Sequence, residues 1–122
     1  MNLMDNGAKF PCAQARAIWL PQERENQYAQ FLQVFDFDTG GAYLLIACDS
    51  RASVRLNGRF VGLALYDGTP GTSWYDRFDL SSYLREGENR LEITVWHQGV
   101  DTNCYTKGRA FVIFSCRQGL PE

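Results

Sequence analysis

An Asn-Gly pair near the middle of the chain restricts the local backbone more than any other feature of the sequence. Asn57 and Gly58 separate two short apolar-rich segments, Val54–Leu56 and Arg59–Val61. A two-residue type I′ turn needs positive φ at both central residues, which Asn and Gly tolerate best, and its twist matches that of paired antiparallel strands. The sequence therefore predicts a β-hairpin centred on this pair.

A second turn signal follows the hairpin. Asp79 is expected to open a single helix-like turn over Leu80–Leu84, because its side chain can accept a hydrogen bond from the backbone just ahead of it. Gly87 supplies a left-handed exit, and Asn89 is expected to start a strand that ends at His97. A further turn is expected near Pro21–Glu25.

Apolar alternation or short apolar segments predict the remaining strands. The full set is Ala17–Leu20, Tyr28–Phe37, Ala42–Cys48, Ala52–Leu56, Arg59–Leu65, Arg90–His97 and Ala110–Cys116. Turn-forming residues separate them, and no window keeps a helical period for three turns. We therefore expect an all-β, jelly-roll β-sandwich of roughly eight antiparallel strands with one short helical turn. The continuous apolar segment at 110–114 predicts a strand at the sandwich centre or one covered by a neighbour, and a further interpretation is that its outer face packs on another domain.

The chain has 122 residues, which fits one domain. We expect an N-terminal extension over 1–16, the sandwich over 17–116, and a tail or the start of a linker to a further domain over 117–122. The formal net charge is -2 and the basic residues are scattered, which argues against nucleic-acid or membrane partners. No signal peptide or transmembrane segment is visible, so a cytoplasmic location is expected.

Four cysteines are spread along the chain, and two of them lie in predicted strands. Cys48 and Cys116 are expected to be buried free thiols, which behave as small apolar side chains. The spacing of the cysteines and the single His97 does not match a zinc site. We expect no cofactor. A structural calcium ion held by loop oxygens is the alternative, but no consecutive acidic loop supports it.

Over about Ala17 to Phe114 the chain resembles the amino-terminal β-sandwich of bacterial α-L-rhamnosidases. The matching segments are Trp19, Asn26–Phe31, Asp49–Arg51, Leu56–Gly62, Trp74–Asp76, Asp79–Leu84, Gly87–Asn89 and Val95–Gly99. The order of hairpin, turn and strand is also similar to galactose-binding-like jelly rolls at the front of β-galactosidase-type enzymes. Asp49–Arg51 before the hairpin, and His97, Gly99, Thr102, Tyr105 and Gly108 after it, favour the rhamnosidases. Ala52 and Leu63–Tyr66 depart from the family pattern, which weakens any inference about that loop.

The resemblance implies an accessory domain of a glycoside hydrolase, with the catalytic carboxylates in a separate helical barrel domain that follows the sandwich. Asp67, Asp76, Asp79 and Asp101 could otherwise supply the two carboxyl groups of an inverting glycosidase, but turn and solvent-exposed roles explain them better. The expected partners are a rhamnose- or galactose-type glycoside and the catalytic domain of the parent chain. The alternatives are a free-standing lectin-like module and a protein-interaction sandwich without sugar affinity.

Sugar binding requires an aromatic platform beside hydrogen-bonding side chains. The segment 66–77 contains both: Trp74 and Tyr75 would stack, and Asp67, Asp76 and Arg77 would bind hydroxyl groups. The alternative is that the two aromatic residues plug one end of the sandwich. A second, weaker cluster after His97 contains Asp101, Asn103 and Tyr105. His97 is either a ligand contact or a structural residue at a strand end.

Overall fold

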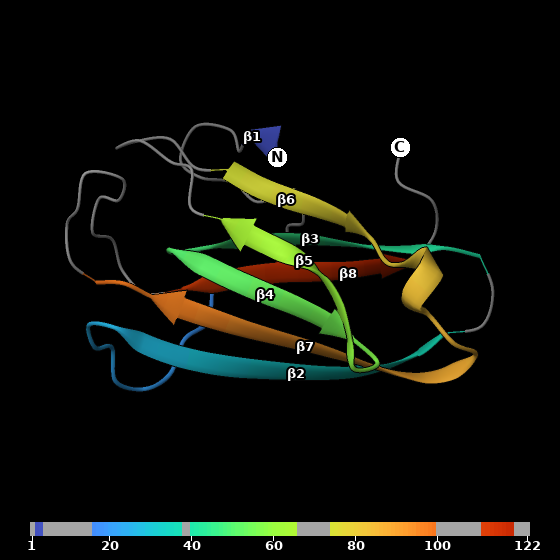
Figure 1. The fold of residues 1–122 in the computed structure, drawn as a ribbon, viewed down its shortest axis with the longest axis horizontal. Helices are drawn as coiled ribbons and strands as arrows, with labels where there is room; N and C mark the ends of the chain where they lie inside the picture. The colour runs from blue at the N-terminus through green and yellow to red at the C-terminus, as the bar shows by residue number, and fades with distance from the viewer. Residues whose placement is uncertain (1, 4–15, 38–39, 66–73, 100–110, 119–122) are drawn as a thin grey trace.

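The computed structural model describes residues 2–3, 16–37, 40–65, 74–99 and 111–118 of the chain. They form two four-stranded antiparallel sheets that stack face to face (Figure 1). The predicted all-β sandwich is therefore confirmed. Every connection except β4–β5 crosses from one sheet to the other.

The first sheet has the order β1-β6-β3-β8 and the second the order β2-β7-β4-β5. In the first sheet the strands are β1 (Asn2–Leu3), β6 (Trp74–Asp79), β3 (Ala42–Cys48) and β8 (Val112–Gln118). In the second sheet they are β2 (Gln27–Phe37), β7 (Gly87–His97), β4 (Arg51–Leu56) and β5 (Arg59–Leu65). Strands β2 and β7 pair along their whole length, from Gln27 opposite His97 to Phe37 opposite Gly87.

The Asn-Gly hairpin forms as predicted. Asn57 has φ 54° and Gly58 has φ 79°, and Leu56 pairs with Arg59 across the turn. The Asn57 side chain also reaches beyond the hairpin, because its Nδ2 donates to Asn89 Oδ1 at 2.8 Å and to the Tyr83 carbonyl at 3.0 Å. The hairpin is thus tied to the start of β7.

The predicted helical turn is a short 3₁₀ turn over Ser81–Tyr83. The Asp79 side chain accepts a hydrogen bond from the Ser81 backbone N–H at 2.9 Å. This bond, together with one from the Ser81 hydroxyl, lowers the pKa of Asp79. Gly87 has φ 86° and provides the left-handed exit that the sequence predicts.

The core lies between the sheets and is built from alternate residues of the central strands. Leu44 and Ile46 of β3 face Leu91 and Ile93 of β7, and all four are almost completely buried. The sheets approach closely at Gly62 of β5, where an added Cβ would lie 2.6 Å from the Phe78 ring of β6. Glycine at this position leaves room for the ring between the sheets.

Several strand predictions need correction. Strand β6 occupies 74–79, which the sequence assigns to a binding loop and a turn. The predicted strand Ala17–Leu20 is reduced to one isolated bridge, between Ile18 and Val112. Among the described strands, β8 lies at a sheet edge rather than at the centre.

The outward face of β3 and β8 is not left bare. Leu45 and Ala47 on this face are 3% exposed and form a second apolar cluster with Phe111 and Ile113. This cluster lies on the opposite side of the first sheet from the main core, because neighbouring residues of a strand point to opposite faces. The continuous apolar sequence at 111–114 therefore contributes to both sides of the sheet, with Val112 and Phe114 in the main core and Phe111 and Ile113 in the second cluster.

Cys48 and Cys116 are free thiols, as predicted, and they are partly rather than fully buried. Burial, with Asp49 and Asp76 nearby, raises the pKa of Cys48 to about 12. Burial also raises the pKa of Cys116 to about 11. Cys12 and Cys104 lie outside the described residues. In the described part of the chain, no helix is long and apolar enough to span a membrane.

Candidate functional site

The predicted sugar-binding segment is divided between the two faces of β6. Asp76 pairs with Ile46 and therefore shares the inward face with it. Tyr75 packs on the outward face beside Leu45, and the Arg77 guanidinium lies 5.8 Å from the centre of the Tyr43 ring on that face. Tyr75 and Arg77 can thus contact one ligand together, whereas Asp76 points the other way.

The rest of the predicted site cannot be placed in the same way. The side chain of Trp74, and the residues Asp67, Asp101, Asn103 and Tyr105, lie outside the described part of the structure. The described residues contain no group of three or more His, Cys, Asp or Glu side chains able to hold a metal ion. The predicted loop clusters stay predictions.

His97 is the last residue of β7, and its side chain points into the sandwich, where it is 1% exposed. Its Nδ1 lies 2.5 Å from Oδ2 of Asp49, which is 3% exposed and lies between β3 and β4. Ser50 donates its hydroxyl to the same Asp49 oxygen at 3.1 Å, and the Gln98 backbone N–H donates to the Ser50 hydroxyl at 2.8 Å. This position fits the structural interpretation of His97 and gives it no surface to offer a ligand.

One shallow hollow of about 480 Å³ lies beside β2 and is lined by Leu20, Pro21, Gln22, Arg24 and Gln27. Its central polar group is already engaged: Gln27 Oε1 accepts from the Trp19 indole at 2.9 Å and from the Arg24 backbone at 3.0 Å. These bonds hold the segment before β2 in place and leave few polar groups for a ligand.

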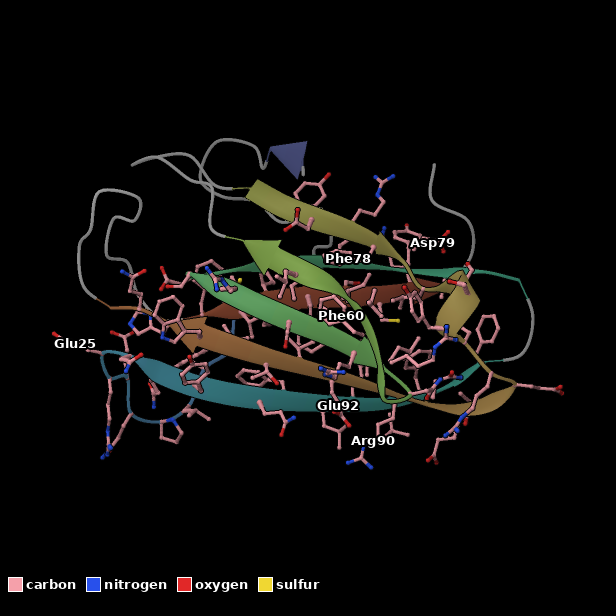
Figure 2. The ribbon with its side chains drawn as sticks, viewed as in Figure 1. Glu25, Phe60, Phe78, Asp79, Arg90 and Glu92 are labelled. Carbon is pink, nitrogen blue, oxygen red and sulfur yellow. The ribbon has the colours of Figure 1, made fainter. Side chains whose placement is uncertain are left out.

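The outward face of the second sheet is the most exposed apolar surface among the described residues. We call it the open face. It consists of the alternate residues of β2, β7, β4 and β5 that point away from the core, and its large apolar members are Tyr28, Leu32, Val34, Phe60 and Leu63, which are 46–65% exposed. Figure 2 shows Phe60, Glu92 and Arg90 on this side of the molecule.

Cross-strand contacts order the side chains of the open face. Trp96 stands between Tyr28, whose ring is stacked on it at 6.4 Å, and Arg51, whose guanidinium lies 5.8 Å from its ring centre. The Trp96 indole donates to Asn26 Oδ1 at 2.8 Å. At the other edge of the sheet the Arg55 guanidinium lies 5.8 Å from the Phe60 ring. These contacts fix large side chains that would otherwise move freely.

The sequence carries a signal for this face that points to no function by itself. The outward positions of β2 include the apolar residues Tyr28, Leu32 and Val34 as well as Gln30 and Asp36, so the side of the strand that faces away from the core is only partly polar. Antiparallel strands that face water on one side alternate apolar and polar residues. The departure from alternation marks the open face, but only the pairing of β2 with β7 shows what lies beside it.

The fold and part of the sequence match a known enzyme. The chain is 32% identical to a stretch of a GH78 family rhamnosidase of Bacillus sp. GL1, with a TM-score of 0.80 over 86% of this chain and 12% of that one. It is a glycoside hydrolase-related β-sandwich. No protein-family model matches the sequence, and no curated protein matches it either.

More distant structures share the fold of this glycoside hydrolase-related sandwich. An α-L-rhamnosidase from Aspergillus terreus is 18% identical, with a TM-score of 0.52 over 80% of this chain and 12% of that one. A GH2 family member from Bacteroides cellulosilyticus is 17% identical, with a TM-score of 0.55 over 93% of this chain and 18% of that one. In all three structures the chain spans less than a fifth of the matched protein.

Proposed function

We propose that the chain is the amino-terminal accessory domain of a glycoside hydrolase resembling α-L-rhamnosidase, and that it binds carbohydrate without catalysis of its own. The observation that carries this proposal is the match to the Bacillus rhamnosidase, which covers 86% of this chain but 12% of the enzyme. A domain that corresponds to 12% of such an enzyme leaves most of the enzyme's length to other domains.

The geometry of the described residues supports a non-catalytic role. A glycosidase of the usual kind places two carboxyl groups on either side of the scissile bond in an accessible pocket. Asp49 and His97 are the buried ionisable pair of the described sandwich, and they are 3% and 1% exposed. A sugar cannot reach them. Their contact joins β7 to the β3–β4 turn, which is a structural task.

Carbohydrate binding is supported by the aromatic side chains that the sandwich holds at its surface. Sugars present apolar C–H faces and a rim of hydroxyl groups, so their sites combine aromatic rings with hydrogen-bonding side chains. Tyr75 with Arg77 on β6, and Tyr28 with Trp96 and Arg51 on the open face, provide this combination.

The proposal is tested with the isolated chain in two assays. The first is an NMR titration with L-rhamnose, D-galactose and a neutral rhamnose-containing hexasaccharide, for which we expect saturable shifts. The second is turnover of a chromogenic α-L-rhamnoside, for which we expect no product. Turnover that follows the protein through purification would overturn the non-catalytic assignment. If no NMR signal shifts at millimolar sugar, the proposal of carbohydrate binding fails and a scaffold role remains.

A further inference from the structure

We infer that the open face binds an extended oligosaccharide across strands β2, β7, β4 and β5. This inference rests on the proposed carbohydrate-binding function and names the surface and the form of ligand that it would use. It differs from the sequence-based expectation, which places sugar binding at β6 and the segment before it.

Apart from Trp96, the residues of the open face on the central strands β7 and β4 are polar, and its other large apolar residues stand on the edge strands β2 and β5. One row crosses the sheet from β2 to β5 and contains Gln30, Thr94, Ser53 and Leu63. Its first three side chains are polar, and the last one, at the β5 edge, is apolar. In a parallel row Leu32 and Phe60 stand at the two edges, with Glu92 and Arg55 between them.

This order of side chains is the reverse of that in a protein interface. Protein interfaces bury an apolar centre, from which charged residues are depleted, inside a polar rim. A second protein domain seated here would cover Glu92 and Arg55 at its centre, which costs free energy unless each finds a partner. A ligand covered with hydroxyl groups can instead bond to this polar centre while its C–H surfaces contact the aromatic edges.

The hydrogen-bonding groups of the open face suit neutral hydroxyls. Gln30, Thr94 and Ser53 can each donate and accept, so they can bond to a sugar hydroxyl in either direction. Arginines and carboxylates are interspersed on the face, and Arg90 Nε lies 3.2 Å from Glu92 Oε1. Neither charge dominates, so a neutral sugar is favoured over a polyanion or a polycation.

The spacing of the aromatic side chains favours a chain of sugars over a single ring. The row of Tyr28 and Trp96 and the row of Leu32 and Glu92 are separated by four residues along β2 and β7, which corresponds to roughly 13 Å at the rise of an antiparallel strand. Phe60 lies in the second row at the far edge of the sheet. A ligand that contacts both Tyr28 and Phe60 must therefore cross the face diagonally.

The inference is tested with three aromatic-to-alanine variants, with affinity measured by NMR titration and calorimetry. Tyr28→Ala and Phe60→Ala remove the rings at the two ends of the open face, and both residues are at least half exposed, so the core is left intact. Tyr75→Ala tests the competing site, because it removes the aromatic ring that the proposed function places with Arg77 on β6. The probes are L-rhamnose and the neutral rhamnose-containing hexasaccharide.

We expect Tyr28→Ala and Phe60→Ala each to weaken hexasaccharide binding roughly tenfold, which corresponds to about 1.4 kcal/mol, and each to weaken it more than Tyr75→Ala does. We also expect the hexasaccharide to bind more tightly than L-rhamnose. If Tyr75→Ala weakens binding at least as much as Tyr28→Ala and Phe60→Ala, or if both probes bind equally well, the inference fails and the proposed function stands. If the wild-type chain binds neither probe, carbohydrate binding and the inference fail together. Concentration-dependent dimerisation through Tyr28 and Phe60, seen by light scattering without sugar, would instead identify a second copy as the occupant.

Discussion

His97 and Asp49, which lie 48 positions apart in the sequence, meet inside the sandwich with Nδ1 and Oδ2 at 2.5 Å. The contact joins the end of β7 to the turn between β3 and β4, and so links the two sheets. The opposite side of the ring is enclosed, because Gly99 and the Trp19 ring lie against it.

Asp49→Ala should destabilise the sandwich strongly. It leaves the imidazole of His97 and the hydroxyl of Ser50 without their buried partner, and each buried polar group left unsatisfied costs about 1–3 kcal/mol. The free energy of unfolding, measured by urea denaturation with tryptophan fluorescence, should fall accordingly. Glu88→Ala, at an exposed position on β7, is the control and should change it by less than about 0.5 kcal/mol. Equal unfolding midpoints for both variants would show that the pair contributes nothing.

Asn89 should be the most sensitive polar residue of the β7 corner. It is fully buried, accepts from the Arg85 backbone N–H at 2.9 Å, and donates to the Arg85 and Gly87 carbonyls at 2.8 and 3.0 Å. Asn89→Ala leaves these groups unpaired and should cost about 2–3 kcal/mol in the free energy of unfolding.

Asn89→Asp is the informative companion variant. It keeps the shape of the side chain but replaces the donating Nδ2 with an oxygen that would face the same two carbonyls. Thermal unfolding should therefore place its Tm no higher than that of Asn89→Ala. A Tm near that of the wild-type chain would show that the two donated bonds are unimportant.

Gly62→Ala should destabilise the sandwich through the ring that crosses between the sheets. The new Cβ would lie 2.6 Å from Cε1 of Phe78, and overpacking of this kind costs about 1–3 kcal/mol. Phe78→Leu shortens the side chain and should relieve the clash in the double variant. The double-variant cycle, measured by chemical denaturation, should show a coupling of at least about 0.5 kcal/mol. Strictly additive changes would mean that the sheets separate to admit the methyl group.

Stability should fall in alkaline solution partly because of Cys48. Its thiol has a pKa raised from 9.0 to about 12 by burial and by the neighbouring carboxylates, so above pH 9 the unfolded chain releases a proton that the folded chain retains. Deprotonation thus favours the unfolded state, and the free energy of unfolding declines as pH rises from about 9 towards 12. Urea titrations at several pH values should show a shallower decline for Cys48→Ala than for the wild-type chain. The raised pKa of Cys116 acts in the same direction and remains in both proteins.

Local signals in the sequence predicted the fold well where they act over a few residues. The Asn57-Gly58 turn, the Asp79 bond at the 3₁₀ turn and the left-handed Gly87 all appear as expected. Strand β6 was missed because glycine, proline and serine dominate the residues just before it, which made Trp74 to Arg77 look like part of a loop. Its strand conformation comes from pairing with β3, a partner some thirty residues earlier.

The surface suited to a ligand was harder to predict than the fold. Alternation along β7 continues inward through Leu91, Ile93 and Val95 to His97, so the burial of His97 could have been inferred from the sequence. The contact between His97 and Asp49 could not be inferred in this way, because the two residues meet only when β3 and β7 are in opposite sheets. The open face is likewise assembled from four strands, and no single segment of sequence contains its polar centre and both of its edges.

The pairing of β3 with β8 also has a consequence for protein synthesis. Ala42 lies opposite Gln118 and Cys48 opposite Val112, so one edge of β3 stays unpaired until β8 has been synthesised. Contacts of this sequence separation form slowly and expose unpaired strand edges while they are awaited. The strands of the second sheet all leave the ribosome before β8 does, whereas the first sheet is completed only when β8 is available to pair with β3.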